Sequence, residues 1–282
     1  MVLHPRLLTC YEARRALQSR ESGDRFVELS LDLGVSREVC RIVDEGLLVG
    51  DVVVEWRYLG EIAEDSRGVY VIEDKPRRLC FFADGHFYAL AVSGEGHAPT
   101  VEVDGIHMHR VKDIYPEEDA LQKVRLLGQL RCKKVLDICT GLGYTSIQAR
   151  RLGACKVVTI EKDRNILALA RINPWSRILF EDPSIEVVEA DAVEYVEELD
   201  VVFDAILHDP PTIKIAGELY SGGFYKSLYR VLKRKGTLVH YVGRPGRGMG
   251  AKIYVGVMRR LRAVGFAVSF DRDTECVVAV KV

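Results

Sequence analysis

Residues 135–145 read Val-Leu-Asp-Ile-Cys-Thr-Gly-Leu-Gly-Tyr-Thr. An apolar run with an acid near its end passes into a glycine-containing turn, and the residues that follow have the pattern of a helix. Glycines let the backbone pass close to a ligand, and the first turn of a helix offers N–H groups without partners in the helix. A dinucleotide-binding turn would read G-x-G-x-x-G and hold a diphosphate. Here the third glycine is missing and Asp137 stands at the strand end, which suits a ligand that carries an ammonium group.

Acidic residues also close the next two strands of the pattern. Glu161 ends the run Lys156–Glu161 and lies twenty residues after Gly141, the distance at which a carboxylate meets ribose hydroxyls. Asp191 follows the next run, Ile185–Glu189. Because parallel strands end at the same edge of a sheet, the three acids are expected to line one binding crevice. Glu161 has a second interpretation, in which it only begins the next helix.

Two patterns of periodicity divide the chain near residue 112. Before it, short apolar runs alternate with turn pairs such as Asp84-Gly85, which is typical of antiparallel strands. Strands are expected there at 26–31, 41–43, 47–54, 69–72, 79–82, 87–92 and 100–103, and helices at 7–20 and 55–64. After a helix at 116–130, strands alternate with helices. The strands are expected at 134–139, 156–161, 185–189, 203–208, 237–242, 267–270 and 277–280, and the helices at 144–152, 164–172, 192–199, 223–232 and 251–264.

Strand–helix alternation predicts an α/β fold with a parallel sheet and helices on both faces. The last two strands are close enough for an antiparallel hairpin. The sequence therefore predicts two domains. Residues 1–112 would form a smaller β-rich domain with a substrate or accessory role, and residues 113–282 would form the catalytic domain.

The fourth strand of the second pattern ends in His208-Asp209-Pro210-Pro211-Thr212. Two prolines fix the backbone, which suits a site that must aim a carboxylate and a carbonyl at one point. The alternative is a plain loop.

Together these features resemble the class I S-adenosylmethionine-dependent methyltransferases, whose seven-stranded Rossmann-like sheet closes on an antiparallel hairpin. Residues 137–143 are similar to the first motif of that family, D-x-G-x-G-x-G, with Cys139 in place of the first glycine. The resemblance implies that S-adenosylmethionine is the cofactor and that Asp137 orients its methionine part. It also implies that acids of the next strands contact the ribose and adenine. The cofactor-binding residues implied in this way are Asp137, Thr140, Gly141, Gly143, Tyr144, Thr145, Glu161, Lys162, Asp191 and Ala192.

Residues 209–212 resemble the D/N/S-P-P-Y/F/W motif of methyltransferases that act on amino nitrogens. In that family the acid and a proline carbonyl accept hydrogen bonds from the target amine, so Asp209 and Pro210 are the implied catalytic residues. Two acceptors favour a pyramidal nitrogen whose lone pair points at the sulfonium methyl. Thr212 replaces the aromatic residue that stacks on a flipped base. Tyr220 and Phe224 are candidates for that role, unless they belong to the core.

A longer resemblance, including residues 217–221 and 238–243, is to a group of uncharacterised archaeal methyltransferases. Its part in the N-terminal domain is Gly105–Arg110, where a lid or substrate wall would form; a plain surface segment is the alternative. The residues expected to contact substrate are His208, Pro211, Tyr220, Phe224, Arg244, His107, His109 and Arg110.

Composition restricts the class of protein. The chain has 282 residues, of which 48% are hydrophobic and 29% charged, and it has no apolar run of the roughly 18 residues that a membrane helix needs. Its seven cysteines are scattered without zinc-type spacing, so neither a disulfide framework nor a metal is expected. No signal-peptide pattern begins the chain, and a cytoplasmic location is expected. Only two Asn and four Gln occur, which indicates a thermophile.

The net charge of −1 hides an asymmetry. Residues 178–209 hold eleven carboxylates and no Lys or Arg, whereas residues 226–282 hold thirteen Lys or Arg and three carboxylates. A basic surface with Arg244, Arg247 and Lys252 would suit a polyanion, although solvated helix faces explain the run equally well. With the amino-nitrogen motif, this favours an N-methyltransferase whose partner is RNA. Its target would be N4 of cytosine or N6 of adenine, with ribosomal RNA the first place to look.

Two other functions fit parts of the sequence. An aminopropyltransferase (polyamine synthase), which uses decarboxylated S-adenosylmethionine, has the same fold with a small β domain in front. The carboxylates of residues 178–209 would suit its polyamine. Those enzymes usually carry a G-G-G-D-G-like turn where residues 139–143 read Cys-Thr-Gly-Leu-Gly. The other alternative is a binding protein without activity, against which the strand-end acids and Asp209 argue. The sequence leaves the oligomeric state open.

Overall fold

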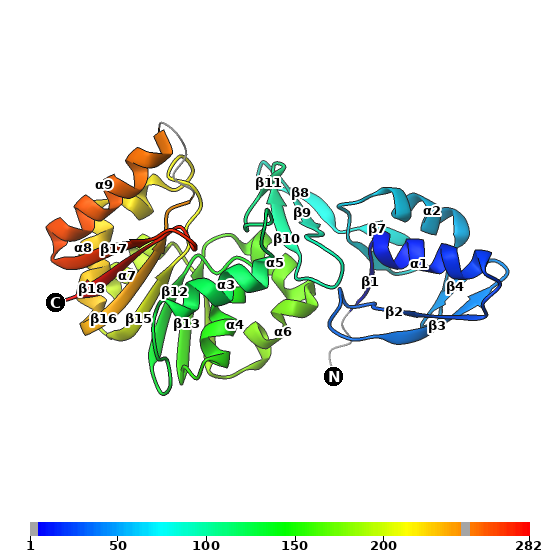
Figure 1. Ribbon diagram of the computed structural model, residues 1–282, viewed down its shortest axis with the longest axis horizontal. Helices are drawn as coiled ribbons and strands as arrows, with labels where there is room; N and C mark the ends of the chain where they lie inside the picture. The colour runs from blue at the N-terminus through cyan, green and yellow to red at the C-terminus, as the bar shows by residue number, and fades with distance from the viewer. Residues whose placement is uncertain (1–4, 244–248) are drawn as a thin grey trace. The chain divides into compact units, whose positions relative to one another are not determined.

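The computed structural model describes residues 5–243 and 249–282, which divide into two compact units (Figure 1). The first unit consists of residues 1–116 and 168–177, and the second of residues 117–167 and 178–282. The architecture confirms the expected α/β Rossmann-like fold with a β-rich N-terminal part. The expected boundary after residue 112 lies close to the end of the first stretch, but segment 168–177 is an addition that the sequence did not indicate.

Residues 5–115 of the first unit form three antiparallel sheets and two helices. One sheet has the order β1 (Arg6–Leu8), β6 (Tyr70–Ile72), β7 (Pro76–Arg78). The second runs β2 (Phe26–Leu29), β3 (Glu38–Val43), β4 (Gly46–Val49), β5 (Val52–Glu55), and the third β11 (Ile106–His107), β10 (Thr100–Val103), β9 (His86–Ala91), β8 (Cys80–Ala83). Helices α1 (Cys10–Glu21) and α2 (Trp56–Glu64) share an apolar core with the second sheet, around Leu29, Leu47 and Leu59.

Two expected elements of this unit differ most from the structure, and strands β1, β7 and β11 were not expected. The helix expected from Leu7 begins at Cys10, because Thr9 and Glu12 form a capping box at its start, and the residues before it pair with β6. The single strand expected at 47–54 is a hairpin of β4 and β5, since the chain turns at Gly50 with a φ of 61°.

Segment 168–177 holds the end of helix α5 (Arg164–Ile172) and the short 3₁₀ helix η1 (Pro174–Ser176). The Asn173 side chain caps η1 by accepting a hydrogen bond from the amide of Trp175. The indole Nε1 of Trp175 donates to the carbonyl of Leu33 at 2.9 Å. These contacts attach the segment to the first unit.

The second unit is built on one seven-stranded sheet with the strand order β14-β13-β12-β15-β16-β18-β17. Its strands are β12 (Lys134–Ile138), β13 (Lys156–Glu161), β14 (Ile185–Glu189), β15 (Phe203–His208), β16 (Leu232–Tyr241), β17 (Phe266–Asp271) and β18 (Cys276–Lys281). The first five are parallel, and β18 is antiparallel to both of its neighbours, as the closing hairpin predicted. The remaining helices are α3 (Pro116–Arg125), α4 (Tyr144–Arg151), α6 (Arg177–Glu181), α7 (Ala192–Glu198), α8 (Gly222–Val231), α9 (Met249–Val264) and the 3₁₀ helix η2 (Gly217–Tyr220).

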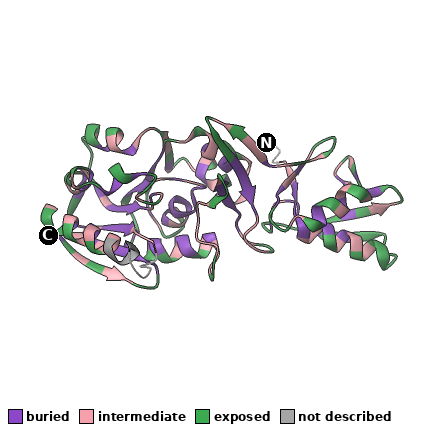
Figure 2. Ribbon diagram, turned by 90° about the horizontal axis from the view of Figure 1, so that it is seen from above, coloured by how far each residue is buried: buried purple, intermediate pink, exposed green. Residues whose placement is uncertain are grey.

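The strands of this sheet are largely buried (Figure 2), and their apolar side chains belong to two clusters, one on each face. Leu136 packs on the face that α7, α8 and α9 cover, and its neighbour Val135 packs on the face of α3, α4 and α6. Both faces of the sheet are apolar and are covered by helices. Ligands are therefore expected to bind at the loops that follow its strands. In the part of the chain that the structure describes, no helix has the length and apolarity required to cross a lipid bilayer.

Candidate active site

The loop between β12 and α4 turns at the carboxyl edge of the sheet. The amides of Cys139 and Thr140 both donate to the carbonyl of Ile160 at 3.0 Å, which attaches the loop to β13. Gly143 has a φ of 79°, and a Cβ there would lie 2.5 Å from a methyl carbon of Leu179. Cys139 has a φ of 69° at the position where the methyltransferase motif has glycine, a conformation that costs a non-glycine residue about 1 kcal/mol. The loop therefore keeps the backbone path expected of a glycine-rich turn.

Asp137 is buried beneath this loop. Its Oδ2 atom accepts hydrogen bonds from the hydroxyls of Thr145 at 2.8 Å, Ser146 at 2.5 Å and Thr159 at 3.2 Å. Its Oδ1 atom has no hydrogen-bond partner within residues 5–243 and 249–282. Burial raises the pKa of Asp137 to about 6, although the three hydroxyls oppose this. Asp137 thus anchors the first turn of α4, and only Oδ1 is left for an N–H donor of a ligand.

Other predicted loop residues are occupied in the same way. Thr140, Tyr144 and Thr145 are almost completely buried, so little of these residues is exposed for the expected ligand contacts, which stay predictions. The Thr140 hydroxyl lies 2.7 Å from that of Thr159.

Glu161, at the end of β13, turns its carboxylate toward the loop. One oxygen accepts from the amide of Gly141 at 3.0 Å and the other from the amide of Asp163 at 3.1 Å. Glu161 is 8% exposed, and burial raises its pKa. These bonds support both interpretations that the sequence left open, because the carboxylate lies beside the loop and also receives an amide at the start of the following helix.

Asp191 follows β14 and caps α7, since its Oδ1 atom accepts from the amide of Val193 at 2.8 Å. The ammonium of Lys162 lies 4.0 Å from the Oδ2 atom of Asp191 and 3.8 Å from a carboxylate oxygen of Glu218. Ala192 is the first residue of α7 and is buried. The three acids that end β12, β13 and β14 therefore lie along one edge of the sheet, as parallel register requires.

Asp209 comes directly after β15, beside the loop of β12. Its amide donates to the carbonyl of Ile138 at 3.2 Å, and its side chain is 23% exposed. Pro210 is buried, and the carbonyl of Pro211 accepts from the Tyr220 hydroxyl at 2.9 Å. No hydrogen bond to the Oδ1 atom of Asp209 occurs among the described residues. Asp209 is thus a carboxylate with one accessible oxygen at the edge where the other acids lie.

Lys123 is a site residue that the sequence did not indicate. It lies on α3, and its ammonium contacts Asp209 Oδ2 at 2.7 Å and Asp119 Oδ2 at 2.8 Å. The ammonium also lies 3.9 Å from the ring centre of Tyr241. The Lys123 side chain is 4% exposed; burial opposes its charged form, but Asp209 and Asp119 outweigh burial and raise its pKa. The i, i+4 pair with Asp119 is visible in the sequence, but its burial depends on the packing of α3.

His208, the last residue of β15, is completely buried. Its ring stacks on that of His240, with centres 4.2 Å apart, and neither ring nitrogen of His208 has a partner in the described part of the chain. Burial and the neighbouring His240 hold the pKa of His208 well below its usual value. His240 in turn contacts the Tyr225 hydroxyl at 3.0 Å. His208 therefore lies in the layer beneath Asp209, where direct contact with a substrate, as the sequence suggested, would require its exposure.

The aromatic residues proposed to stack on a base belong to the core. Tyr220 and Phe224 are 4% and 2% exposed, and both pack in the apolar cluster that includes Leu228 and Leu238. The Tyr220 hydroxyl donates a hydrogen bond to the carbonyl of Pro211. Their expected role as a stacking surface is wrong for this conformation, because neither ring presents a face to solvent.

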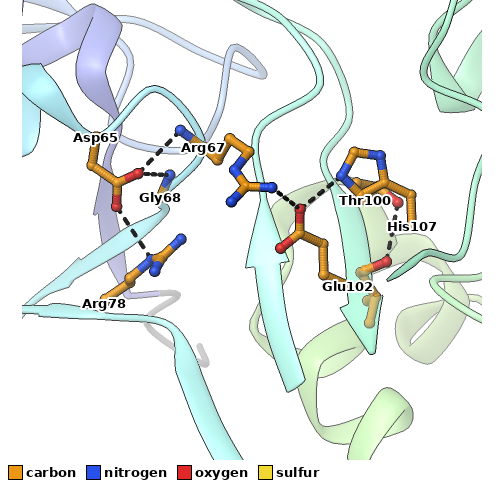
Figure 3. A network of polar contacts seen from close by, with 8 residues as sticks. Asp65, Arg67, Gly68, Arg78, Thr100, Glu102 and His107 are labelled. Atoms are coloured by element: carbon orange, nitrogen blue, oxygen red, sulfur yellow. Dashed lines mark hydrogen bonds and ion pairs between the residues drawn. The ribbon is translucent and has the colours of Figure 1, made fainter. Parts of the chain in front are cut away.

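The predicted substrate residues of the N-terminal domain lie in the first unit. His107 Nε2 contacts Glu102 at 2.7 Å, and Arg67 reaches the same carboxylate oxygen at 3.4 Å (Figure 3). His109 Nδ1 lies 3.0 Å from the Thr100 hydroxyl, and Arg110 is half-buried. Their role in substrate binding stays a prediction.

Nearby in the same view, Asp65 accepts from the amides of Arg67 and Gly68 and pairs with Arg78. Arg244 and Arg247, proposed for RNA binding, lie outside the described residues.

Comparison with known proteins finds similarity to spermine and spermidine synthases. Residues 115–245 match the model of the spermine/spermidine synthase domain. A polyamine aminopropyltransferase of Thermotoga petrophila is 33% identical over 139 residues, which cover 48% of this chain and 47% of that enzyme. The chain thus matches about half the length of that relative. A crystal structure of spermidine synthase in complex with the transition state analogue AdoDATO has a TM-score of 0.59. It is 23% identical, over 72% of this chain and 73% of that one, and supports the fold.

These findings correct the predicted activity. The expectation of an N-methyltransferase that acts on an RNA base, with its roles in RNA modification and ribosomal RNA processing, is wrong. The domain match and the aminopropyltransferase relatives support the alternative that the sequence had left in second place. The resemblance to class I methyltransferases holds for the fold, because one fold serves both reactions. The broader expectation of an enzyme agrees with these relatives.

One relative is matched along its whole length. The uncharacterized protein MJ1233 of Methanocaldococcus jannaschii is 40% identical over 296 residues, which cover 100% of this chain and 97% of that protein. The chain therefore belongs to the same family as this archaeal protein, with a match to the spermine/spermidine synthase domain over the loop, Glu161 and Asp209.

Proposed function

We propose that this chain is an aminopropyltransferase, which moves an aminopropyl group from decarboxylated S-adenosylmethionine to an amine. The observation that carries the proposal is the Asp209 carboxylate. It is 23% exposed and has one oxygen without a partner in the described part of the chain. It follows β15 beside the loop in which a Rossmann-like fold binds the nucleoside part of its ligand. The domain match at residues 115–245 includes both features.

The charges at the sheet edge support a donor that has lost its carboxylate. Asp137, Glu161, Asp191 and Asp209 all contribute carboxyl groups there, and the nearby ammonium of Lys162 already faces Asp191. An intact methionine carboxylate would weaken the attraction of these acids for the donor, whereas a sulfonium with an aminopropyl ammonium carries two positive charges and no negative one. The unpartnered Oδ1 atom of Asp137 is an acceptor suited to an ammonium or amide N–H.

Aminopropyl transfer requires neither a metal nor a redox step. The acceptor nitrogen attacks the propyl carbon next to the sulfonium, a nitrogen–carbon bond forms, and the carbon–sulfur bond breaks. Its electron pair remains on sulfur, which leaves as the neutral thioether 5′-methylthioadenosine. As the nitrogen becomes positive, the Asp209 carboxylate stabilises it and accepts its hydrogen bond, and the released proton passes to that carboxylate or to water.

The turn at residues 139–143 differs from the G-G-G-D-G-like pattern, since Leu142 stands where those enzymes have an acid, and Leu142 is buried. Asp137, beneath the same loop, is the acid that this chain keeps. We therefore expect this chain to contact the aminopropyl group differently from the enzymes that have the G-G-G-D-G-like turn.

The test compares two donors. Purified chain is incubated with S-adenosylmethionine or its decarboxylated form, and with a series of linear diamines and triamines. Nucleoside products are then identified by chromatography and mass spectrometry. We expect 5′-methylthioadenosine to appear only with the decarboxylated donor and an amine present together. Formation of S-adenosylhomocysteine alone, or no turnover of either donor, would contradict the proposal.

A further inference from the structure

A buried ammonium contacts one of the two oxygens of the proposed catalytic carboxylate. Lys123 Nζ lies 2.7 Å from Asp209 Oδ2 and 2.8 Å from Asp119 Oδ2, and its side chain is 4% exposed. Lys123 and Asp209 are 86 positions apart in the sequence, so the contact depends on the tertiary fold. The Asp209 side chain is the more exposed partner, at 23%.

This geometry leaves the two oxygens of Asp209 in different situations. Oδ2 is bound by a charge-assisted hydrogen bond, which is the stronger kind and fixes the plane of the carboxylate. Oδ1 has no partner within residues 5–243 and 249–282 and is the oxygen left for an acceptor amine. Asp119, whose side chain is 5% exposed, supplies a second negative charge to the same ammonium, so the three groups together carry a charge of −1 when all are ionised.

Burial of a lysine at this place costs the desolvation free energy of its ammonium. Desolvation of an ion pair often cancels its attraction, and apolar side chains of similar volume stabilise a fold equally well or better. The chain has another Lys–Asp pair, Lys233 on β16 with Asp204 on β15 at 2.6 Å, at the opposite end of β15 from Asp209. The Lys233 side chain is 46% exposed, as is usual for an ion pair with only a structural role.

We propose that Lys123 is a positioning residue for Asp209: its ammonium holds the carboxylate in one orientation, so that Oδ1 alone faces the acceptor amine. The inference rests on the proposed aminopropyl transfer. In that reaction the amine must approach along one line toward the propyl carbon, and a carboxylate free to rotate would offer either oxygen in many directions. Lys123 itself contacts no substrate and transfers no proton.

Four variants test the inference: Lys123→Met, Lys123→Ala, Lys123→Arg and, as the matched control, Lys233→Ala. The acceptor is the linear diamine that gives the wild type its fastest release of 5′-methylthioadenosine. Lys123→Met keeps most of the side-chain volume without the charge. Its kcat is expected to fall by roughly 10²-fold, with the KM for the donor within about threefold of the wild type, because donor contacts are unchanged. Lys123→Arg keeps the charge and should retain more of the rate than Lys123→Met.

Chemical rescue separates orientation from general stability. Lys123→Ala leaves space for a small cation, so propylammonium in the assay should restore part of its kcat, while Lys123→Met and Lys233→Ala should not respond. The diamine product is followed by mass, which distinguishes it from any product of propylamine. Thermal melting shows whether each variant is folded.

The outcomes distinguish the two ideas. If the wild type releases no 5′-methylthioadenosine, aminopropyl transfer is wrong and the inference falls with it. If the wild type is active and folded Lys123→Met retains the wild-type kcat, the role of Lys123 is overturned while the proposed function stands. Loss of rate in Lys123→Met and Lys233→Ala alike would equally overturn it, because a merely structural pair would then give the same effect.

Discussion

The ammonium of Lys123 lies 2.7 Å from the Oδ2 atom of Asp209, although Lys123 is on the helix before the sheet and Asp209 is at the end of its fourth strand in sequence. The contact makes α3 part of the site. The acids at the strand ends would by themselves form a binding edge of the sheet. Lys123 in addition gives one of them, Asp209, a fixed orientation. The chemistry of this edge therefore depends on both the sheet and the helix packed beside it.

Replacement of Asp209 tests the centre of the proposed site. We expect Asp209→Ala to lower kcat by roughly 10²-fold or more, as for the loss of one preorganised electrostatic group. Asp209→Asn keeps an acceptor oxygen and should retain part of the rate, unless the carboxylate must accept the proton. Release of 5′-methylthioadenosine measures the rate.

Donor affinity, measured by calorimetry, is the control for this pair. It should stay within a few-fold of the wild type, because Asp209 is proposed to contact the acceptor. Parental rates in both variants would exclude Asp209 from catalysis.

A second prediction concerns the loop after β12. Gly143→Ala places a methyl group 2.5 Å from Leu179 at a φ of 79°, so the loop must move, and donor affinity should fall at least tenfold, about 1.4 kcal/mol. Gly128→Ala is its matched control, because Gly128 has a φ of 78° but open space around the added carbon.

The control should lose only the stability that positive φ costs, about 1 kcal/mol, and bind the donor normally. Calorimetry measures the affinities and chemical denaturation the stabilities. Equal donor affinity in the two variants would mean that the shape of the loop is not needed for binding.

The buried carboxyl of Asp137 predicts a pH dependence of stability. Its pKa is about 6 in the folded chain and 3.8 for an ordinary aspartate, so between these values the folded state binds more protons and the wild type loses stability as pH rises. Asp137→Asn removes this loss. The free energy of unfolding of Asp137→Asn, relative to the wild type, should therefore increase by about 3 kcal/mol from pH 3.5 to pH 7. Denaturant unfolding at both pH values measures it, and a difference that is independent of pH would contradict the burial argument.

His240 predicts the opposite sign. Burial lowers its pKa to about 3 from 6.5, so the unfolded chain binds the proton first and the wild type loses stability as pH falls below 6.5. His240→Gln should be less stable than the wild type at pH 7, because its contact with the Tyr225 hydroxyl changes. That deficit should shrink by about 2 kcal/mol at pH 5. A deficit that stays constant or grows on acidification would be inconsistent with a neutral, buried His240.

The sequence predicted the sheet of the second unit well, because its strands and helices are long and regular in their spacing. Lys156–Glu161 and Phe203–His208 are strands with the expected bounds. The hairpin at 47–54 was missed because its turn has only two residues, Gly50 and Asp51, with apolar residues on both sides. Two turn residues inside an otherwise apolar stretch were taken for part of one strand.

The candidate site was predicted in its acids but not in its reaction. Asp137, Glu161 and Asp209 lie at the edge that strand order implies, yet the same acids suit a methyl or an aminopropyl donor. Lys123 could not be found, since an i, i+4 pair with Asp119 is also common on exposed helix faces. Tyr220 was misplaced for a similar reason, because its burial depends on the packing of α8 and η2 against the sheet.

Trp175 and its neighbours have a consequence for how the chain is made. The segment that attaches to Leu33 is encoded between β13 and β14, so the first unit is interrupted in the gene by the first part of the Rossmann-like half, residues 117–167. As the ribosome synthesises the chain from its N-terminus, β12, α4 and β13 emerge before the first unit receives its last piece. Completion of the N-terminal part must therefore wait for the start of the second. If recombination exchanged only residues 1–116 between relatives, the new residues 1–116 would meet a Trp175 segment that was not selected to fit them.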